Sequence, residues 1–128
     1  MDKRIKKLWV EALRTGEYKK GVGSLRDVDS KGKTRFCCLG VLCNLHALEH
    51  PKLAAKETDP RWYLGQDSLL PLKVAEWAGF EVTEMLGFWK ARSFGIDVKG
   101  RGYVKSLATY NDAGDNFHEI ADRIRKGL

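Results

Sequence analysis

The sequence predicts a single α+β domain over residues 1–128, mainly helical, with one or two small antiparallel β-hairpins. Three observations lead to this class. Apolar residues recur at helical spacing near both ends, an almost wholly apolar run lies in the middle, and short β-favouring segments flank polar turns that contain glycine. With 128 residues, 43% of them hydrophobic, the chain is long enough to bury one core without disulfides.

The first predicted element is a helix over residues 2–15. Its apolar residues recur at i, i+3, i+4, i+7 and i+8 and form one stripe: Ile5, Leu8, Trp9, Ala12 and Leu13. Gly16 fits the position that ends a helix. The basic residues fall mostly off the stripe, and we expect the stripe to pack on the protein's own core rather than on a membrane.

A β-hairpin follows, with strands at Ser24–Val28 and Thr34–Cys37 around the polar turn Asp29–Lys33. The next segment, residues 38–48, is apolar on nearly every helical face, which predicts a buried central helix that ends at Pro51.

Residues 51–70 show no sustained periodicity, so we predict a loop with a short strand at Trp62–Leu64. Pro71 suits the first position of a short helix that Gly79 ends. Residues 80–93 fit no single pattern.

A second small hairpin is predicted from Phe94–Val98 and Tyr103–Lys105. A short helix at residues 107–110 follows and stops at Asn111–Gly114. The last helix covers residues 116–126. Asp115 or Asn116 can cap it, Glu119 lies in capping-box position, and the apolar stripe is Phe117, Ile120, Ala121 and Ile124.

The charge pattern indicates an anionic partner. The net charge is +6, and it is distributed as +6 over residues 1–35, −3 over residues 36–88 and +3 over residues 89–128. A positive field raises encounter rates with nucleotides and nucleic acids, although charge that serves only solubility is the alternative. Loops that combine cations with aromatic rings suit such ligands. The predicted contacts are Lys19, Lys20, Lys33, Arg35, Arg101 and Tyr103.

The cysteines predict a reduced, cytoplasmic protein. The chain has an odd number of cysteines, and they are clustered: Cys37, Cys38 and Cys43. A secreted disulfide-rich domain would instead have an even number at spaced positions. We expect no signal peptide, because the basic start lacks an apolar region, and no apolar run approaches the roughly 20 residues that span a bilayer.

Three groups of residues could carry chemistry. Cys43, His46 and His50 share one helical face and suit zinc, but a buried cysteine beside two boundary histidines is the favoured interpretation. Cys37 and Cys38 lie near a helix start, where a thiolate nucleophile is favoured, yet both suit a core equally well.

The third group surrounds His118. Asp115, His118 and Asp122 share a face on which a histidine base could be oriented by carboxylates. The solvated side of an amphipathic helix has the same spacing, and we favour that explanation. No catalytic residue, metal or cofactor is therefore predicted.

Several motifs resemble those of small accessory proteins of tailed bacteriophages and prophages, a family with no assigned reaction. They are Ala12–Tyr18, Gly21-x-Gly23-x-Leu25, Phe36–Cys43, Leu70–Gly79 and Asn111–Asp122. The resemblance implies a protein that works in the cytoplasm of the host, in host takeover or anti-defence.

We therefore predict a non-enzymatic protein that binds an anionic ligand, a nucleotide or nucleic acid, or a host protein. The alternative is a small enzyme or metalloprotein that uses Cys43, His46 and His50 or the His118 group. The sequence leaves the oligomeric state open, a homodimer included.

Overall fold

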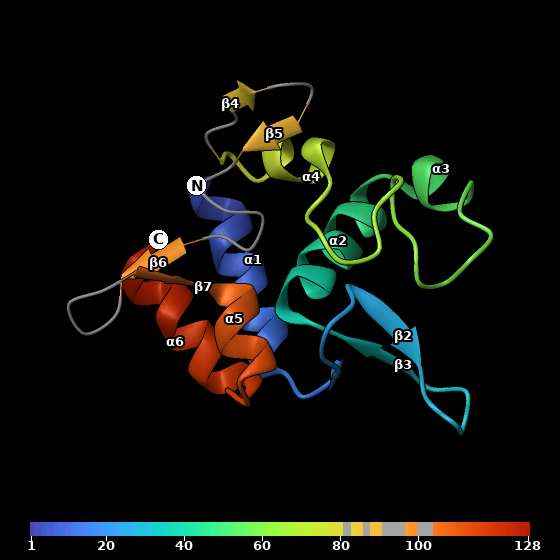
Figure 1. Ribbon diagram of the computed structural model, residues 1–128, viewed down its shortest axis with the longest axis horizontal. Helices are drawn as coiled ribbons and strands as arrows, with labels where there is room; N and C mark the ends of the chain where they lie inside the picture. Colours follow the sequence, from blue (N-terminus) through green and yellow to red (C-terminus); the bar gives the residue numbers. More distant parts are fainter. Residues whose placement is uncertain (81–82, 86–87, 91–96, 100–103) are drawn as a thin grey trace.

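A computed structural model describes residues 1–80, 83–85, 88–90, 97–99 and 104–128, with the strands between 83 and 106 described by their backbone pairing (Figure 1). In these residues there are six helices and seven short strands. The helices are α1 (Lys3–Arg14), α2 (Cys38–Glu49), α3 (Pro51–Ala54), α4 (Leu72–Trp77), α5 (Leu107–Asp112) and α6 (Phe117–Gly127). The strands are β1 (Lys19–Lys20), β2 (Arg26–Val28), β3 (Thr34–Phe36), β4 (Thr83–Met85), β5 (Phe88–Lys90), β6 (Asp97–Lys99) and β7 (Val104–Ser106). The predicted α+β class is confirmed.

Helix α2 lies at the centre of the core, as its composition predicts. It packs against α1, α3, α4, α5 and β3. Its first six residues are all buried, whereas Leu48 near its end is 70% exposed. The indole of Trp9 on α1 is fully buried, and its Nε1 donates a hydrogen bond of 3.0 Å to the Cys38 carbonyl. This bond fixes α1 against the first turn of α2.

Gly40 allows the strand region to approach α2 closely. A Cβ atom at this position would lie 1.8 Å from the carbonyl oxygen of Leu25, which is itself fully buried. That carbonyl accepts a hydrogen bond from the Cys37 amide, just before α2 begins. Glycine is therefore required here by packing, which outweighs its low helix propensity.

The predicted first hairpin is confirmed, with β2 and β3 antiparallel. The structure adds β1, which pairs parallel to the other edge of β3 through Lys19 opposite Arg35 and gives the order β1-β3-β2. A two-residue strand has no periodicity to detect, so the sequence does not predict it. In the second predicted hairpin, residues 94–96 and 103 lie outside the described residues, and the antiparallel pairing of β6 with β7 confirms the remainder. Strands β4 and β5 form a third hairpin within residues 80–93.

The buried carboxamide of Asn111 joins three elements at the end of α5. Its Nδ2 donates to the Gly21 carbonyl at 3.0 Å, and its Oδ1 accepts from the Cys38 amide at 3.1 Å, at the first turn of α2. The Lys20 ammonium donates to the Asn111 carbonyl at 2.8 Å. Buried polar groups need such partners, so this residue holds α2, α5 and the chain after β1 together.

The prediction for residues 51–70 is wrong in two places. Pro51 does not lead into a loop but begins α3, because its fixed φ suits a first helical turn. The strand predicted at Trp62–Leu64 is only an isolated bridge between Tyr63 and Gln66, because Leu64 and Gly65 turn the chain back with φ of 48° and 85°.

The other helices follow the prediction within a residue or two. Gly79 ends α4 with φ of 78°, and Pro71 caps α4 rather than forming its first residue. Asn116, not Asp115, caps α6 in a complete capping box with Glu119. No described helix has the length and apolar character to cross a membrane.

Candidate anion-binding groove

Helices α1 and α6 lie side by side and antiparallel, and their buried stripes hold them together (Figure 1). From α1 the stripe contributes Ile5, Trp9, Val10 and Leu13, and from α6 it contributes Phe117, Ile120, Ala121 and Ile124. Arg14, in the last turn of α1, pairs with Asp122 of α6 at 2.6 Å. The antiparallel arrangement brings the N-terminal half of α1 beside the C-terminal half of α6.

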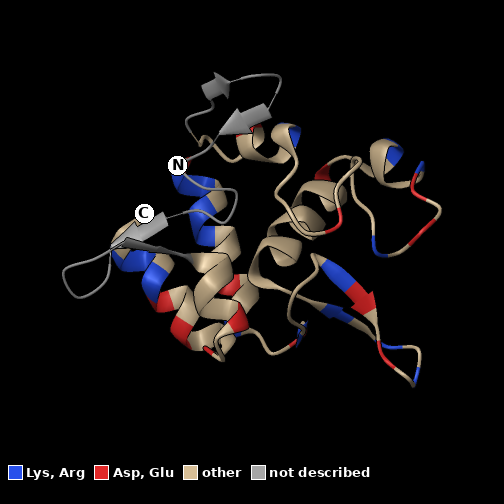
Figure 2. Ribbon diagram, in the orientation of Figure 1, with Lys and Arg blue, Asp and Glu red and all other residues tan. Residues whose placement is uncertain are grey.

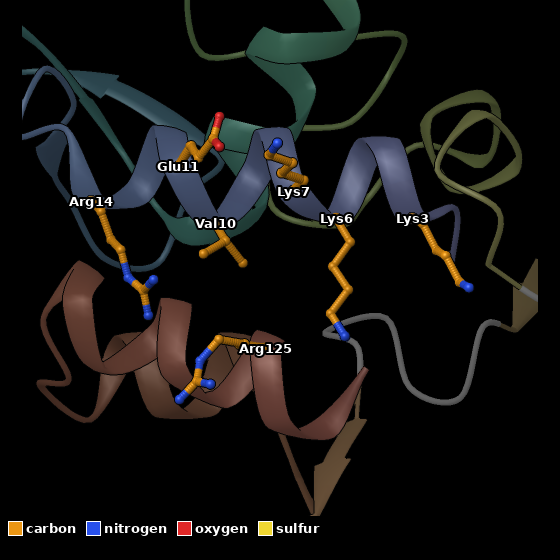
Figure 3. Close-up of a pocket in the computed structure, with 7 residues that line it drawn as sticks. All are labelled: Lys3, Lys6, Lys7, Val10, Glu11, Arg14 and Arg125. Atoms are coloured by element: carbon orange, nitrogen blue, oxygen red, sulfur yellow. The ribbon is translucent and has the colours of Figure 1, made fainter.

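A groove of about 340 Å³ runs along this seam. Seven described residues line it: Lys3, Lys6, Lys7, Val10, Glu11, Arg14 and Arg125. Figure 3 shows Lys6, Val10 and Arg14 reaching from α1 toward α6. The groove lining therefore contains five basic residues, one carboxylate and one apolar residue.

Most of this positive charge is not neutralised within the described part of the chain. Of the five basic residues in the lining, only Arg14 has an ion-pair partner among the described residues. The other four are Lys3, Lys6, Lys7 and Arg125. Figure 2 shows basic residues on the first half of α1 and the last turns of α6. The Arg14–Asp122 pair is itself on the surface, where such pairs contribute little.

Helix stability does not explain the lysines of α1. The first turn of α1 contains no acidic residue, although the positive end of a helix dipole favours one. Lys3 lies three and four residues before Lys6 and Lys7, and like charges at these spacings destabilise a helix. The cap is good, because Asp2 accepts from the Ile5 amide at 2.9 Å. This repulsion is offset in part, because Asp2 and Glu11 lie four residues from Lys6 and Lys7, a spacing at which opposite charges attract.

The hairpin cations that the sequence predicts as ligand contacts are mostly engaged within the protein. The Lys19 ammonium pairs with Asp29 at 2.5 Å, and Arg35 makes two hydrogen bonds to Asp27, of 2.8 and 2.7 Å. The Lys20 ammonium donates to a backbone carbonyl, as described above.

Lys33 is exposed, and its side chain has no partner among the described residues. Arg101 and Tyr103 lie outside the described residues. The hairpin therefore offers one unengaged cation of the four predicted there, and the α1–α6 groove offers four.

The histidine pair on α2 belongs to an aromatic cluster. The rings of His46 and His50 stack with their centroids 4.1 Å apart, and Trp77 of α4 meets both edge-on. Nδ1 of His46 lies 2.6 Å from the Tyr63 hydroxyl, and Nδ1 of His50 donates to the His46 carbonyl at 2.8 Å.

Burial controls protonation in this cluster. The pKa of His46 is lowered from 6.5 to about 4, mainly by desolvation and to a smaller extent by the nearby His50. Burial raises the pKa of Tyr63 to about 12. At neutral pH both groups are therefore uncharged, and one hydrogen bond joins the His46 ring to the Tyr63 hydroxyl. No group of three or more histidine, cysteine or acidic residues within the described residues is arranged to hold a metal ion.

All three cysteines are reduced and buried. Cys37 caps α2, with its sulfur accepting from the Gly40 amide at 3.4 Å, and burial raises its pKa to about 11. Burial raises the pKa of Cys38 and Cys43 well above the usual range. A thiolate nucleophile is disfavoured in such surroundings, because the charged form loses its hydration.

The residues around His118 are engaged separately rather than with one another. Asp115 pairs with Arg123 at 2.7 Å, Asp122 pairs with Arg14 of α1, and the His118 side chain is exposed. These carboxylates stabilise the α6 surface and do not orient the imidazole.

The groove residues were not predicted from the sequence, although a signal was present. The strongest positive charge lies in residues 1–35, and five of its cations are on α1. The sequence places these cations mostly off the apolar stripe, but it does not show that α6 packs beside α1 and brings Arg125 to the same surface.

Fold and groove together define a small α+β protein with a basic, grooved helix pair. The chain belongs to the family described as a domain of unknown function, DUF8296, whose model matches residues 1–128. No curated protein and no solved structure matches it.

Proposed function

We propose that this protein is a non-enzymatic binding protein for a phosphate-bearing anion, a nucleotide or a nucleic acid, and that the α1–α6 groove is its binding site. The observation that carries the proposal is the concentration in one concave surface of cations that have no ion-pair partner among the described residues: Lys3, Lys6, Lys7 and Arg125. Phosphate groups are bound by such combinations of lysine and arginine.

The motif resemblance supports a second part of the proposal, that the protein is a bacteriophage accessory protein acting in the host cytoplasm. Three reduced, buried cysteines suit that compartment. A nucleotide or nucleic acid is abundant there, and a positive surface would encounter either one rapidly. The hairpin prediction stays open through Lys33, which could extend the surface.

The test compares matched charge removals. A variant with Lys3→Gln, Lys6→Gln and Lys7→Gln removes three groove cations, and its control removes three exposed cations elsewhere by Lys52→Gln, Lys56→Gln and Lys73→Gln. Each ammonium–phosphate contact at about 4 Å in water is worth roughly fivefold in affinity, so the groove variant should bind on the order of a hundredfold more weakly.

Binding is measured by fluorescence anisotropy at low salt, with labelled ATP and a labelled oligonucleotide as probes. The control variant carries the same net charge and should lose much less affinity. Lys33→Gln is measured alongside to test the hairpin. The proposal fails if neither probe binds the unmodified protein, or if groove and control variants weaken binding equally, since that result reflects net charge alone.

A further inference from the structure

The wall of the α1–α6 groove is mostly apolar surface, although most of its lining residues are charged. Val10 is the one apolar residue among the described lining residues, so the rest of this surface comes chiefly from the methylene stems of the basic side chains. Long basic side chains combine an apolar stem with a charged head that stays in water. A bare phosphate group would meet the heads but leave the apolar wall exposed to water, which is unfavourable.

The positive charge that has no ion-pair partner among the described residues is concentrated toward one end of the groove. Lys3, Lys6 and Lys7 fall within about 6 Å along α1. Val10 lies one turn further along, and Figure 3 shows its side chain pointing toward α6. Arg125 adds a cation on the α6 wall. A ligand in the groove therefore meets a cluster of ammonium groups at one end and apolar surface beside it.

An ion pair bounds the other end of the groove. Arg14 lies one turn beyond Val10, and its pair with Asp122 at 2.6 Å bridges α1 and α6. The groove volume of about 340 Å³ is at the lower end of the range for pockets that hold small molecules, roughly 300–1,000 Å³. These dimensions suit one small ligand that has an anionic head and an apolar body.

Resting on the proposed binding of a phosphate-bearing anion, we propose that the ligand of the groove is a phosphorylated amphiphile, a phosphate monoester of an aliphatic chain, bound as a single molecule. The phosphate contacts Lys3, Lys6 and Lys7, and the chain covers Val10 and the lysine stems. A phosphate monoester carries about 1.5 to 2 negative charges at pH 7, so it matches a cluster of cations better than a carboxylate does.

The experiment is isothermal titration calorimetry with hexyl, octyl and decyl phosphate, each below the concentration at which it forms micelles. Complete burial of a methylene strengthens binding about fourfold. An open groove covers only part of each one, so affinity should rise about twofold per methylene. Titrations at two temperatures should give a negative heat-capacity change, the marker of apolar burial.

Control ligands separate the head from the chain. Inorganic phosphate has no chain, and decyl maltoside has a chain without charge, so each should bind at least tenfold more weakly than decyl phosphate. Decanoate carries a single negative charge and should bind several-fold more weakly. Vesicles of phosphatidylcholine with phosphatidic acid present the same phosphate on a membrane, and labelled ATP presents it on a nucleotide.

Substitutions at Lys6 separate the two contributions within the protein. Lys6→Met keeps an apolar stem but removes the ammonium, so decyl phosphate should bind roughly fivefold more weakly while the dependence on chain length is unchanged. Lys6→Ser also removes the stem and should reduce the dependence on chain length. Lys52→Met, at an exposed lysine outside the groove lining, is the matched control and should bind like the unmodified protein.

The outcomes distinguish this inference from the proposed function. If ATP binds and requires Lys6 while affinity does not rise with chain length, the inference is overturned and the proposed function stands. If decyl phosphate binds as expected and neither ATP nor the oligonucleotide binds, the inference stands and the nucleotide part of the proposed function fails. If no probe binds, both fail.

Three further results would overturn the inference. Decyl maltoside or decanoate could bind as tightly as decyl phosphate, which would remove the role of the phosphate. The protein could bind the vesicles and not monomeric decyl phosphate, which would assign the surface to a membrane. Finally, Lys6→Met and Lys52→Met could weaken binding equally, which would place the ligand outside the groove.

Discussion

Acidification should destabilise this protein through His46. The imidazole is 3% exposed and faces the His50 ring, the Tyr63 hydroxyl and Trp77, while Glu49 and Lys73 are the nearby charged groups. Its pKa is lowered from 6.5 to about 4, first by desolvation and then by His50. Between these two values the unfolded chain binds more protons than the native protein. Stability is therefore complete above about pH 6.5 and is lost as the pH falls toward 4.

The magnitude follows from the two pKa values. A full shift of this size corresponds to about 3 kcal/mol, and the part lost on going from pH 7 to pH 5 is about 2 kcal/mol. At pH 5 most carboxylates are still ionised. In addition, the hydrogen bond from Lys19 lowers the pKa of Asp29 to about 2, so this pair is still ionised at pH 5 and does not contribute to the loss of stability.

The assay is urea denaturation of the unmodified protein and of His46→Asn at pH 7 and pH 5. Asparagine places an amide oxygen near the position of Nδ1 but does not titrate, so the variant should lose about 2 kcal/mol less between the two pH values. His118→Gln, at the exposed histidine, is the control and should behave like the unmodified protein. An NMR titration of the His46 ring in the native protein provides a second measurement. Equal losses in all three proteins, or a ring that titrates near pH 6.5, would refute the reasoning.

Three further substitutions test the packing. Gly40→Ala should lower the urea midpoint, because the clash with the Leu25 carbonyl costs about 1–3 kcal/mol and exceeds the gain of about 1 kcal/mol in helix propensity. Asn111→Ala should lower the free energy of unfolding by several kcal/mol, because each buried polar group left unpaired costs about 1–3 kcal/mol. Asn116→Ala should lower the free energy of unfolding by about 1 kcal/mol, because it removes the α6 cap. An unchanged urea midpoint in any of these three variants would contradict the estimate for that variant. Cys37 should react with iodoacetamide at neutral pH only as fast as the chain unfolds, and rapid labelling of native protein would contradict its burial.

Local patterns in the sequence predicted most of the secondary structure. The helices at both ends, the central helix, and the turns at Gly16 and Gly79 follow from spacing, capping and glycine conformation, which are properties of a few consecutive residues. Strand β1 and helix α3 escaped prediction because two or four residues contain too little pattern, and the bridge at Tyr63 depended on an unusual turn through Leu64.

The site was less accessible to sequence reasoning. The excess of positive charge near the N-terminus was evident, but which cations remain unpaired depends on contacts between distant residues. Lys19 and Arg35 are neutralised by Asp29 and Asp27 across the sheet region, and this pairing required the registers of the strands. Lys6 has no such partner among the described residues.

The sequence by itself determined the fold class, the positions of the main helices and the basic character of the protein, because each depends on local spacing or composition. Only the tertiary structure decided that α6 lies antiparallel beside α1 and that their cations share one groove. The physical reason is that charges far apart in the chain combine into one field only after packing brings them together. The same packing neutralises others, such as Arg35, and removes them from that field.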